Sequence, residues 1–401
     1  MADASIYERD LDRTPANYVP LSPISFLLRS AHVYGGRTAI LHGERRISYA
    51  GMLERCRRLA SALAQAGVGR GDTVAVIAPN VPEMLEAHYA VPMLGAVLCP
   101  INTRLDAGTV AFILQHSEAR VLIADAELSP IVGPALASLA RRPLVIDIDD
   151  PLAAGGERIG AHEYEAFIAG GDPAHPVRLP QDEWQAIALG YTSGTTGDPK
   201  GVVTHHRGAY LNACAGALEF QLSPESVFLW TLPMFHCNGW SYTWGVTLAG
   251  AMHVCLRRVE PALVYRMIGE HGVTHLCGAP VVLTMLIHAP DARPLPRPVR
   301  LMTGGAAPPS PVIARMEQLN FLVRHLYGLT ETYGPSMVNA WQPGLEAMPL
   351  EQKAAFMARQ GVVHHMMHAA GVFEPQTMAP VPADGSTIGE LMLRGNTIMR
   401  G

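Results

Sequence analysis

Residues 191–201, YTSGTTGDPKG, restrict the fold and the function of this 401-residue chain more than any other stretch. The three glycines of this segment allow the backbone to approach a ligand closely, and successive N–H groups can then surround an anion. Its hydroxyl side chains add hydrogen-bond donors, and Lys200 adds a mobile positive charge suited to phosphate oxygens. The segment therefore predicts a loop that binds a polyphosphate.

The flanking sequence favours this interpretation over a polar surface loop, which is the alternative for any cluster rich in Gly, Ser and Thr. The run at 186–190 is short and apolar, as expected of a buried strand, and 205–220 has few helix breakers and predicts a helix. A phosphate loop beyond the carboxyl end of a strand is a recurrent α/β site. The motif differs from the common nucleoside-triphosphatase loop, because Lys200 lies between proline and glycine.

Helix and strand signals alternate along most of the chain, which is typical of parallel sheets covered by helices. Strands are predicted at 73–78, 96–100, 120–124, 227–231, 252–255, 274–277, 300–302 and 321–325. The stretch 126–182 is rich in Pro and Gly and is interpreted as a boundary. We expect an α/β fold with two stacked subdomains, at 1–180 and 181–332, each with a mostly parallel sheet. The start of a smaller β-rich subdomain is expected at 333–401.

The composition limits the class of protein. Hydrophobic residues make up 49% of the chain and charged residues 16%, which permits a sizeable core. The net charge of −5 gives no indication of a nucleic-acid partner. The most apolar stretch, 84–101, contains Glu86, His88 and Pro92, so no integral membrane segment is expected. The six cysteines form no Cys-x-x-Cys pair and the N-terminus has no apolar signal core, which together predict a cytoplasmic protein.

Three further loops carry candidate functional residues, each with a structural alternative. Residues 327–335, YGLTETYGP, follow a predicted strand and would place Glu331, a candidate Mg²⁺ ligand, at the edge of the sheet where ligands bind. Taken alone, that segment is more often a solvated turn. Residues 302–309, MTGGAAPP, permit close approach to a flat ligand, or form a tight turn before a helix. Residues 233–240, PMFHCNGW, could line an organic-acid pocket with His236, or belong to the core.

Two other motifs are interpreted as structural. Residues 364–368, HHMMH, have helical spacing but no acidic ligand beside them, so a surface helix is favoured over a metal site. The glycine-rich stretch 67–71 follows a predicted helix instead of a strand, so it lacks the context of a dinucleotide-binding loop. Neither motif is expected to hold a cofactor.

Together the loops resemble the adenylate-forming superfamily of acyl-CoA synthetases, luciferases and peptide-synthetase adenylation domains. The similar motifs are the phosphate loop, the adenine-side loop, the Tyr-Gly-x-Thr-Glu motif, the aromatic-His motif and a later core motif, at 192–201, 304–308, 327–331, 235–236 and 389–395. The resemblance extends from about Ser22 to the end of the chain. Residues 232–240 are most similar to the fatty-acid, short-chain and aryl CoA ligases.

The resemblance implies ATP-dependent activation of a carboxylic acid, and a short- to medium-chain fatty acid is expected. The carboxylate would attack the α-phosphate of ATP to give an acyl-adenylate, and the thiol of coenzyme A would then displace AMP. The implied ligands are therefore ATP, Mg²⁺ and coenzyme A. A homodimer is left open as the state of assembly.

The resemblance also implies roles for individual residues. The catalytic set comprises Lys200, Thr330, Glu331 and His236, of which His236 would border the acyl group. Mg²⁺ would be held by Glu331 and Thr196. The nucleotide and its phosphates would be bound by Thr192, Ser193, Gly194, Thr195, Thr196, Gly197, Lys200, Gly305, Ala306, Ala307, Tyr327, Gly328 and Thr330.

Members of the superfamily continue beyond the point that corresponds to Gly401 with a ribose-binding Asp, a hinge and a mobile C-terminal domain that carries a catalytic lysine. We therefore expect this chain to be a fragment or a natural truncation, with weak or no full activity of its own. Two alternatives to a CoA ligase stay open. One is adenylation with a different acceptor, and the other is a non-catalytic fragment that binds a nucleotide or an acyl group.

Overall fold

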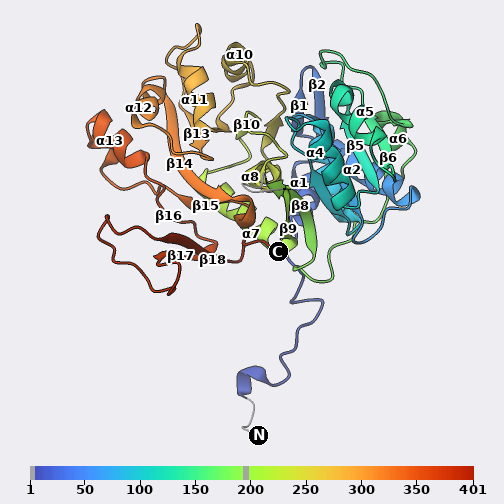
Figure 1. Ribbon diagram of the computed structural model, residues 1–401, viewed down its shortest axis with the longest axis horizontal. Helices are drawn as coiled ribbons and strands as arrows, with labels where there is room; N and C mark the ends of the chain where they lie inside the picture. The colour runs from blue at the N-terminus through green and yellow to red at the C-terminus, as the bar shows by residue number, and fades with distance from the viewer. Residues whose placement is uncertain (1–4, 193–197) are drawn as a thin grey trace.

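The computed structural model describes residues 5–192 and 198–401. Two large sheets stand beside each other with helices on their faces, and a small antiparallel sheet lies below one of them (Figure 1). The N-terminal residues extend from the body as an arm, whereas the C-terminal residue lies near the middle of the molecule (Figure 1). The expected α/β fold, with mostly parallel sheets and a smaller β-rich part near the C-terminus, is confirmed.

The first large sheet is built mainly from the N-terminal half of the chain. Its strands are, in spatial order, β7 (His162–Glu163), β6 (Leu144–Ile148), β5 (Val121–Asp125), β3 (Thr73–Ile77), β4 (Val97–Pro100), β8 (Ala186–Thr192) and β9 (Lys200–His205). Neighbours from β7 to β8 pair in parallel, whereas β8 and β9 form an antiparallel hairpin. The accompanying helices are α2 (Tyr49–Gln65), α3 (Pro82–Met93), α4 (Ala107–His116), α5 (Ser129–Ala137) and α6 (Tyr164–Ala169).

The second large sheet combines the C-terminal half with one hairpin from the start of the chain. Its order is β16 (Val362–Val363), β15 (Gly334–Val338), β14 (Phe321–Leu329), β13 (Val299–Thr303), β12 (His275–Gly278), β10 (Val227–Leu229), β11 (Met252–Val254), β1 (Thr38–His42) and β2 (Arg45–Ser48). The strands from β14 to β1 pair in parallel. Both edges of the sheet are antiparallel.

The remaining elements complete both halves. The helices are α1 (Ile24–Tyr34), α7 (His206–Glu219), α8 (Cys237–Trp240), α9 (Tyr242–Ala249), α10 (Pro261–His271), α11 (Pro280–Ile287), α12 (Ser310–Gln318) and α13 (Leu350–Met357). Short 3₁₀ turns occur at η1 (Ile6–Glu8), η2 (Ala126–Leu128), η3 (Thr330–Thr332) and η4 (Leu345–Ala347). The small antiparallel sheet pairs β17 (Met367–Phe373) with β18 (Glu390–Gly395).

Helix α3 shows how the sequence places a helix inside the core. Every residue of α3 is buried, as expected of a helix that is covered on all sides. Its buried Glu86 is tolerated because Arg55 of α2 donates to the carboxylate at 2.6 Å from Nε. Among residues 5–192 and 198–401, no helix is both long enough and apolar enough to cross a bilayer.

The segment before and after the predicted phosphate loop differs from the expected strand–loop–helix order. Strand β8 ends at Thr192, and the chain returns as the antiparallel strand β9 before α7 begins at His206. Strand β9 starts at Lys200, which pairs with Thr192 in the register of the hairpin. The sequence predicted no strand at 200–205, because a second strand so close to the loop leaves no separate periodic signal.

The two sheets do not follow the order of the chain. The hairpin β1–β2 joins the sheet of the C-terminal half, and β8 and β9 join the sheet of the N-terminal half. The stretch 126–182, which was interpreted as a boundary, contributes α5, β6, β7 and α6 to the first sheet. Pairing of β1 with β11 links distant segments, so local periodicity carries no signal for it. The division at 1–180, 181–332 and 333–401 therefore stays a proposal about domains.

The surface helix expected at 364–368 is wrong. His364 is buried, its Nε2 donates to Pro335 O at 3.0 Å, and its Nδ1 accepts from Met366 N at 3.1 Å. Strand β17 then begins at Met367. The backbone partners of His364 and the pairing of β17 with β18 outweigh the helical spacing of the histidines.

A buried cluster of charges joins the two large sheets beyond the ends of β5, β6 and β11. The Arg257 side chain is 7% exposed, and it donates to Asp125 Oδ1 at 2.8 Å and to Asp150 Oδ2 at 2.5 Å. His42 at the end of β1 also contacts Asp150 Oδ2, at 2.7 Å. Burial alone would raise the pKa of Asp150, but its bonds to His42, the Leu152 amide and Arg257 hold that pKa below its ordinary value.

Replacing Arg257 with alanine is expected to lower the free energy of unfolding by about 3 kcal/mol, because two buried carboxylates lose their partner. Arg258→Ala is the matched control, since the Arg258 side chain is 54% exposed and contacts Glu127 at the surface. That change is expected to cost less than about 1 kcal/mol. Urea denaturation of both variants measures the difference, and equal losses would show that the cluster does not hold the sheets together.

Candidate functional site

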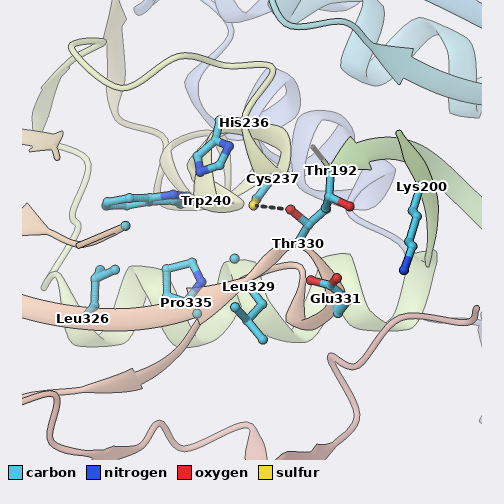
Figure 2. A pocket seen from close by; sticks show the side chains of 13 residues that line it. Thr192, Lys200, His236, Cys237, Trp240, Leu326, Leu329, Thr330, Glu331 and Pro335 are labelled. Atoms are coloured by element: carbon cyan, nitrogen blue, oxygen red, sulfur yellow. Dashed lines mark hydrogen bonds between the residues drawn. The ribbon is translucent and has the colours of Figure 1, made fainter. Parts of the chain in front are cut away.

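A cavity of about 420 Å³ lies between the edges of the two large sheets. Its walls come from the hairpin β8–β9, the segment around α8, the loop after β13, and the turn from β14 through η3 to β15 (Figure 2). The lining residues are Thr192, Lys200, His236, Cys237, Trp240, Gly305, Leu326, Gly328, Leu329, Thr330, Glu331, Gly334 and Pro335. Segments that are far apart in sequence thus meet at one hollow.

The cavity brings together many of the residues predicted for the site. Those that line it are Thr192, Lys200, His236, Gly305, Gly328, Thr330 and Glu331. Among the predicted residues that the structure describes, Ala306, Ala307 and Tyr327 do not line this cavity. Ser193, Gly194, Thr195, Thr196 and Gly197 lie outside the described residues. The roles of all these residues stay predictions.

Lys200 and Glu331 place a positive and a negative charge on the wall of the cavity. They come from different sheets and face the same part of the cavity, and Thr192 and Thr330 lie to one side of them (Figure 2). Within the described chain, neither Lys200 nor Glu331 forms an ion pair. A cation and a carboxylate left unpaired in this way can bind an anion and a divalent cation at neighbouring positions.

The turn η3, which contains Thr330 and Glu331, is held in place by hydrogen bonds to backbone groups. Thr332 is buried, and its Oγ1 accepts from Leu329 N at 2.9 Å and contacts Gly334 O at 2.6 Å. Met399 N donates to Glu331 O at 2.7 Å, and Arg400 N donates to Val203 O of β9 at 2.7 Å. The terminal segment therefore bridges η3 and the hairpin that carries Lys200.

The segment labelled α8 is a left-handed turn, which the sequence analysis did not predict. Residues 237–241 all have positive φ, from +45° at Cys237 to +63° at Ser241, and only Gly239 of the five lacks a Cβ. Left-handed backbone costs about 1–2 kcal/mol for each residue with a side chain. The Asn-Gly pair within HCNGW was the available signal, because both residue types tolerate this conformation.

The left-handed turn carries two residues of the cavity wall, Cys237 and Trp240, and His236 comes directly before it. Cys237 Sγ lies 3.5 Å from Thr330 Oγ1, and burial raises the pKa of the Cys237 thiol to about 11. The thiol is therefore neutral at pH 7 and acts as a wall group. The His236 side chain lines the cavity, and its partial burial lowers the pKa of the imidazole. A neutral His236 can donate a hydrogen bond and adds no positive charge to the site.

Close backbone contacts explain two glycines beside the cavity. A Cβ on Gly328 would lie 1.9 Å from Gly334 O, where β14 turns back into β15. A Cβ on Gly304 would lie 2.5 Å from Leu326 Cδ1 and 2.8 Å from Leu326 O. Both contacts are shorter than side-chain atoms permit, so these glycines set the spacing of β13, β14 and β15 around the site.

The donor set fits a polyphosphate with a magnesium ion better than a metal bound by protein alone. In the described part of the chain, no three His, Cys, Asp or Glu side chains come together as a metal cluster. Glu331 offers one carboxylate, which suits Mg²⁺ because this ion takes its other ligands from phosphates and water. Lys200 would contribute charge to the phosphate oxygens.

The family model of the AMP-binding enzymes matches residues 27–401. The chain belongs to this family. The match covers both sheets, the cavity between them and the small sheet of β17 and β18. The resemblance inferred from the motifs is thereby confirmed.

Curated relatives place the chain among the acid–thiol ligases of the family. It is 49% identical to an acetate/butyrate–CoA ligase of Arabidopsis thaliana and 46% identical to an acetate–CoA ligase of Humulus lupulus. Each alignment covers 98% of this chain and 72% of the relative. Enzymes of this class use ATP and coenzyme A, so those two expected ligands are supported at the level of the class.

Solved structures confirm the fold. The N-terminal domain of FACL13 from Mycobacterium tuberculosis has a TM-score of 0.78 and 24% identity, over 94% of this chain and 90% of that one. An anthranilate–CoA ligase in complex with anthranoyl-AMP has a TM-score of 0.82 and 19% identity, over 96% of this chain and 72% of that one. At these identities the likeness concerns the fold alone.

The expected cytoplasmic location is wrong. The Arabidopsis acetate/butyrate–CoA ligase is named as a peroxisomal enzyme, and so is a trans-cinnamate–CoA ligase of Petunia hybrida that is 41% identical. The expectation rested on scattered cysteines and on the lack of an N-terminal signal core. Those features indicate a reducing environment and do not distinguish one reducing compartment from another.

Replacing Gly328 with alanine is expected to destabilise the fold by at least about 2 kcal/mol and to weaken nucleotide binding, because the new Cβ would displace Gly334. Gly269→Ala is the control, since Gly269 is exposed in α10 and a Cβ there meets nothing within 4 Å. That change is expected to stabilise the protein by about 0.5–1 kcal/mol. Thermal unfolding and titration with ATP test both, and a neutral Gly328→Ala would contradict the close approach of β14 and β15.

Proposed function

We propose that this chain forms the ATP- and acid-binding part of an AMP-forming ligase that activates a short aliphatic acid such as acetate or butyrate. The observation that carries the proposal is the pair Lys200 and Glu331, which face one cavity from two sheets and have no ion partner among the described residues. The acid class is taken from the relatives named as acetate, butyrate and 2-methylpropanoate CoA ligases. A preference for medium-chain acids has no such support.

The proposed roles follow from the need to bring a negatively charged carboxylate close to the negatively charged phosphates of ATP. Lys200 and the hydroxyl of Thr192 would bind phosphate oxygens, and Thr330 would donate to the α-phosphate. Mg²⁺, held by Glu331 with Thr196, would neutralise phosphate charge so that a carboxylate can approach. The loop of Gly305, Ala306 and Ala307 would pass beside adenine. In the same proposal, Ser193, Gly194, Thr195 and Gly197 supply phosphate contacts, and Tyr327 and Gly328 border the base.

The acid would enter from the side of His236 and Trp240, away from Lys200 (Figure 2). A neutral His236 can donate to a carboxylate oxygen and hold it without forming a tight ion pair that would lower its nucleophilicity. The gain in rate then comes from positioning the carboxylate against the α-phosphate. The proposal leaves the state of assembly open. Analytical ultracentrifugation would show whether two copies form a homodimer.

Lys200→Ala is expected to weaken ATP binding by about tenfold or more, because a charge-assisted contact to phosphate is lost. The sequence has one other lysine, Lys353, which pairs with Glu317 at 2.5 Å in a different part of the fold. Lys353→Ala is therefore the matched control and is expected to bind ATP normally. Isothermal titration with ATP and Mg²⁺ measures both, and equal affinities of the two variants would remove Lys200 from the site.

The reaction itself is tested by ATP–pyrophosphate exchange with acetate, butyrate, octanoate and benzoate. Exchange that is greatest with acetate or butyrate supports the proposed acid class, and exchange with octanoate or benzoate alone contradicts it. Release of AMP that depends on coenzyme A identifies the thiol acceptor. Exchange without such release would instead indicate adenylation with a different acceptor, and ATP binding without exchange would indicate a non-catalytic binding module.

A further inference from the structure

One buried amide of α7 connects the left-handed turn at 237–241 with the residue that follows η3. Asn212 of α7 is 2% exposed, and its Nδ2 donates to Ser241 Oγ at 3.2 Å and to Tyr333 O at 2.8 Å. Ser241 Oγ in turn donates to Tyr333 O at 3.3 Å. We call these three groups, the Asn212 amide, the Ser241 hydroxyl and the Tyr333 carbonyl, the amide clamp.

Each member of the amide clamp belongs to a segment that adjoins predicted site residues along the chain. Helix α7 follows β9, which begins at Lys200. Ser241 is the last residue of the left-handed turn that begins at Cys237. Tyr333 comes directly after η3, which contains Thr330 and Glu331. The clamp therefore fixes the relative positions of these segments, although Asn212 itself does not line the cavity of about 420 Å³.

The backbone around the clamp cannot hold its conformation by local preference. Four residues with side chains adopt positive φ in the turn 237–241, and Tyr333 also has a φ of +61°. The buried Asn238 Nδ2 has no hydrogen-bond partner among the described residues. Strained backbone of this kind persists only where its surroundings enforce it, and such strain gathers at functional sites.

Besides the clamp, the contact of Cys237 Sγ with Thr330 Oγ1 at 3.5 Å also reaches η3, whereas other hydrogen bonds of the turn are local. Thr243 Oγ1 donates to Asn238 O at 3.1 Å, and Ser241 N donates to Asn238 O at 3.2 Å. These bonds shape the turn but do not attach it to η3. On the side of η3, Trp244 Nε1 donates to Tyr333 OH at 3.2 Å, which holds the ring and leaves the Tyr333 carbonyl to the clamp.

We propose that Asn212 is a positioning residue, which holds the left-handed turn 237–241 against η3 so that the wall of the acid and ATP site stays in place. The proposal deepens the proposed function and rests on it for any effect on adenylation. The geometric part, that Asn212 fixes the turn, stands without a ligand and can be tested without one.

The direct test measures how fast Cys237 reacts with iodoacetamide at pH 8, with the modified residue identified by mass spectrometry. In the native chain the buried thiol of Cys237 should react slowly, because only the thiolate is a nucleophile. In Asn212→Ala two of the three hydrogen bonds of the clamp are lost and only that of Ser241 Oγ to Tyr333 O remains, so the rate at Cys237 is expected to rise by about tenfold or more. Cys56, Cys99, Cys255 and Cys277 are buried, so their continued protection shows that the variant is folded.

Asn339→Ala is the matched control for the loss of a buried amide. Asn339 is 2% exposed, and its Nδ2 donates to Phe356 O at 2.9 Å and to Arg359 O at 3.1 Å, away from the cavity. This variant is expected to lose stability to a similar extent without faster reaction at Cys237. If both variants increased the rate equally, the effect would reflect general loosening, and the positioning role of Asn212 would be refuted.

Two variants of Ser241 separate the hydroxyl from the backbone conformation. Ser241→Ala removes the hydroxyl and keeps a Cβ at a φ of +63°, whereas Ser241→Gly removes the hydroxyl but relieves the strain. If the clamp acts through the hydroxyl, both variants should raise the rate at Cys237, with alanine giving the larger rise. Native rates in Asn212→Ala and in both Ser241 variants would overturn the proposal.

The link to adenylation is measured by ATP–pyrophosphate exchange with Asn212→Ala. Exchange per folded molecule should fall by about tenfold, since displacement of the wall by a fraction of an ångström disturbs the reacting geometry. Faster labelling of Cys237 with undiminished exchange would refute the positioning of the reaction and leave the turn as a structural feature. If the native chain itself gave no exchange and bound no ATP, the proposed function would fail, and the labelling result would still decide the geometric part.

Discussion

Everything at the site depends on how the two large sheets are held against each other, and β1, which pairs with β11 within the second sheet, reaches that junction through the contact of His42 with Asp150. That pairing inserts a hairpin from the start of the chain into the sheet of the C-terminal half. The buried contacts of Arg257 with Asp125 and Asp150 act at the same junction. Because the cavity has one wall from each sheet, its shape is set by this junction as much as by the residues that line it. The cavity thus lies at a boundary between two sheets instead of within one sheet.

The order of elements and the loops around the cavity could be predicted from local sequence, because helix caps, prolines and glycines mark them. Helix α2 begins where Ser48 accepts from Gly51 N, and α10 has Pro261 in its first turn and ends before Gly272. Glycine-rich segments marked the loops around the cavity. Pairing of β1 with β11 and the return of β9 beside β8 depend on contacts between separate segments, so a periodicity read along one segment could not reveal them. The left-handed turn at 237–241 was missed although its Asn-Gly pair was a local signal, and its contacts with Asn212 and Tyr333 come from segments distant in sequence.

Strain and polar burial are combined in one place in this fold. The turn at 237–241 puts Cys237 and Trp240 at the cavity, and it does so with a backbone that these residues would not adopt in isolation. A single amide at Asn212 then attaches the turn to the segment that carries Thr330 and Glu331. Such an arrangement gives a rigid wall without placing another polar group in contact with the ligands. It also explains how a residue outside the cavity can matter for it.

The insertion of β1–β2 into the second sheet has a consequence for how the chain folds as it is synthesised. Strand β1 has no parallel neighbour until β11 has left the ribosome. All strands of the first sheet, including β8 and β9, are synthesised before β11. Contacts between such distant segments slow folding, because a long loop must be closed before they stabilise anything. The hairpin β1–β2 therefore has one unpaired edge until β11 has been synthesised. Molecular chaperones that shield unpaired strands would be expected to act on this hairpin first.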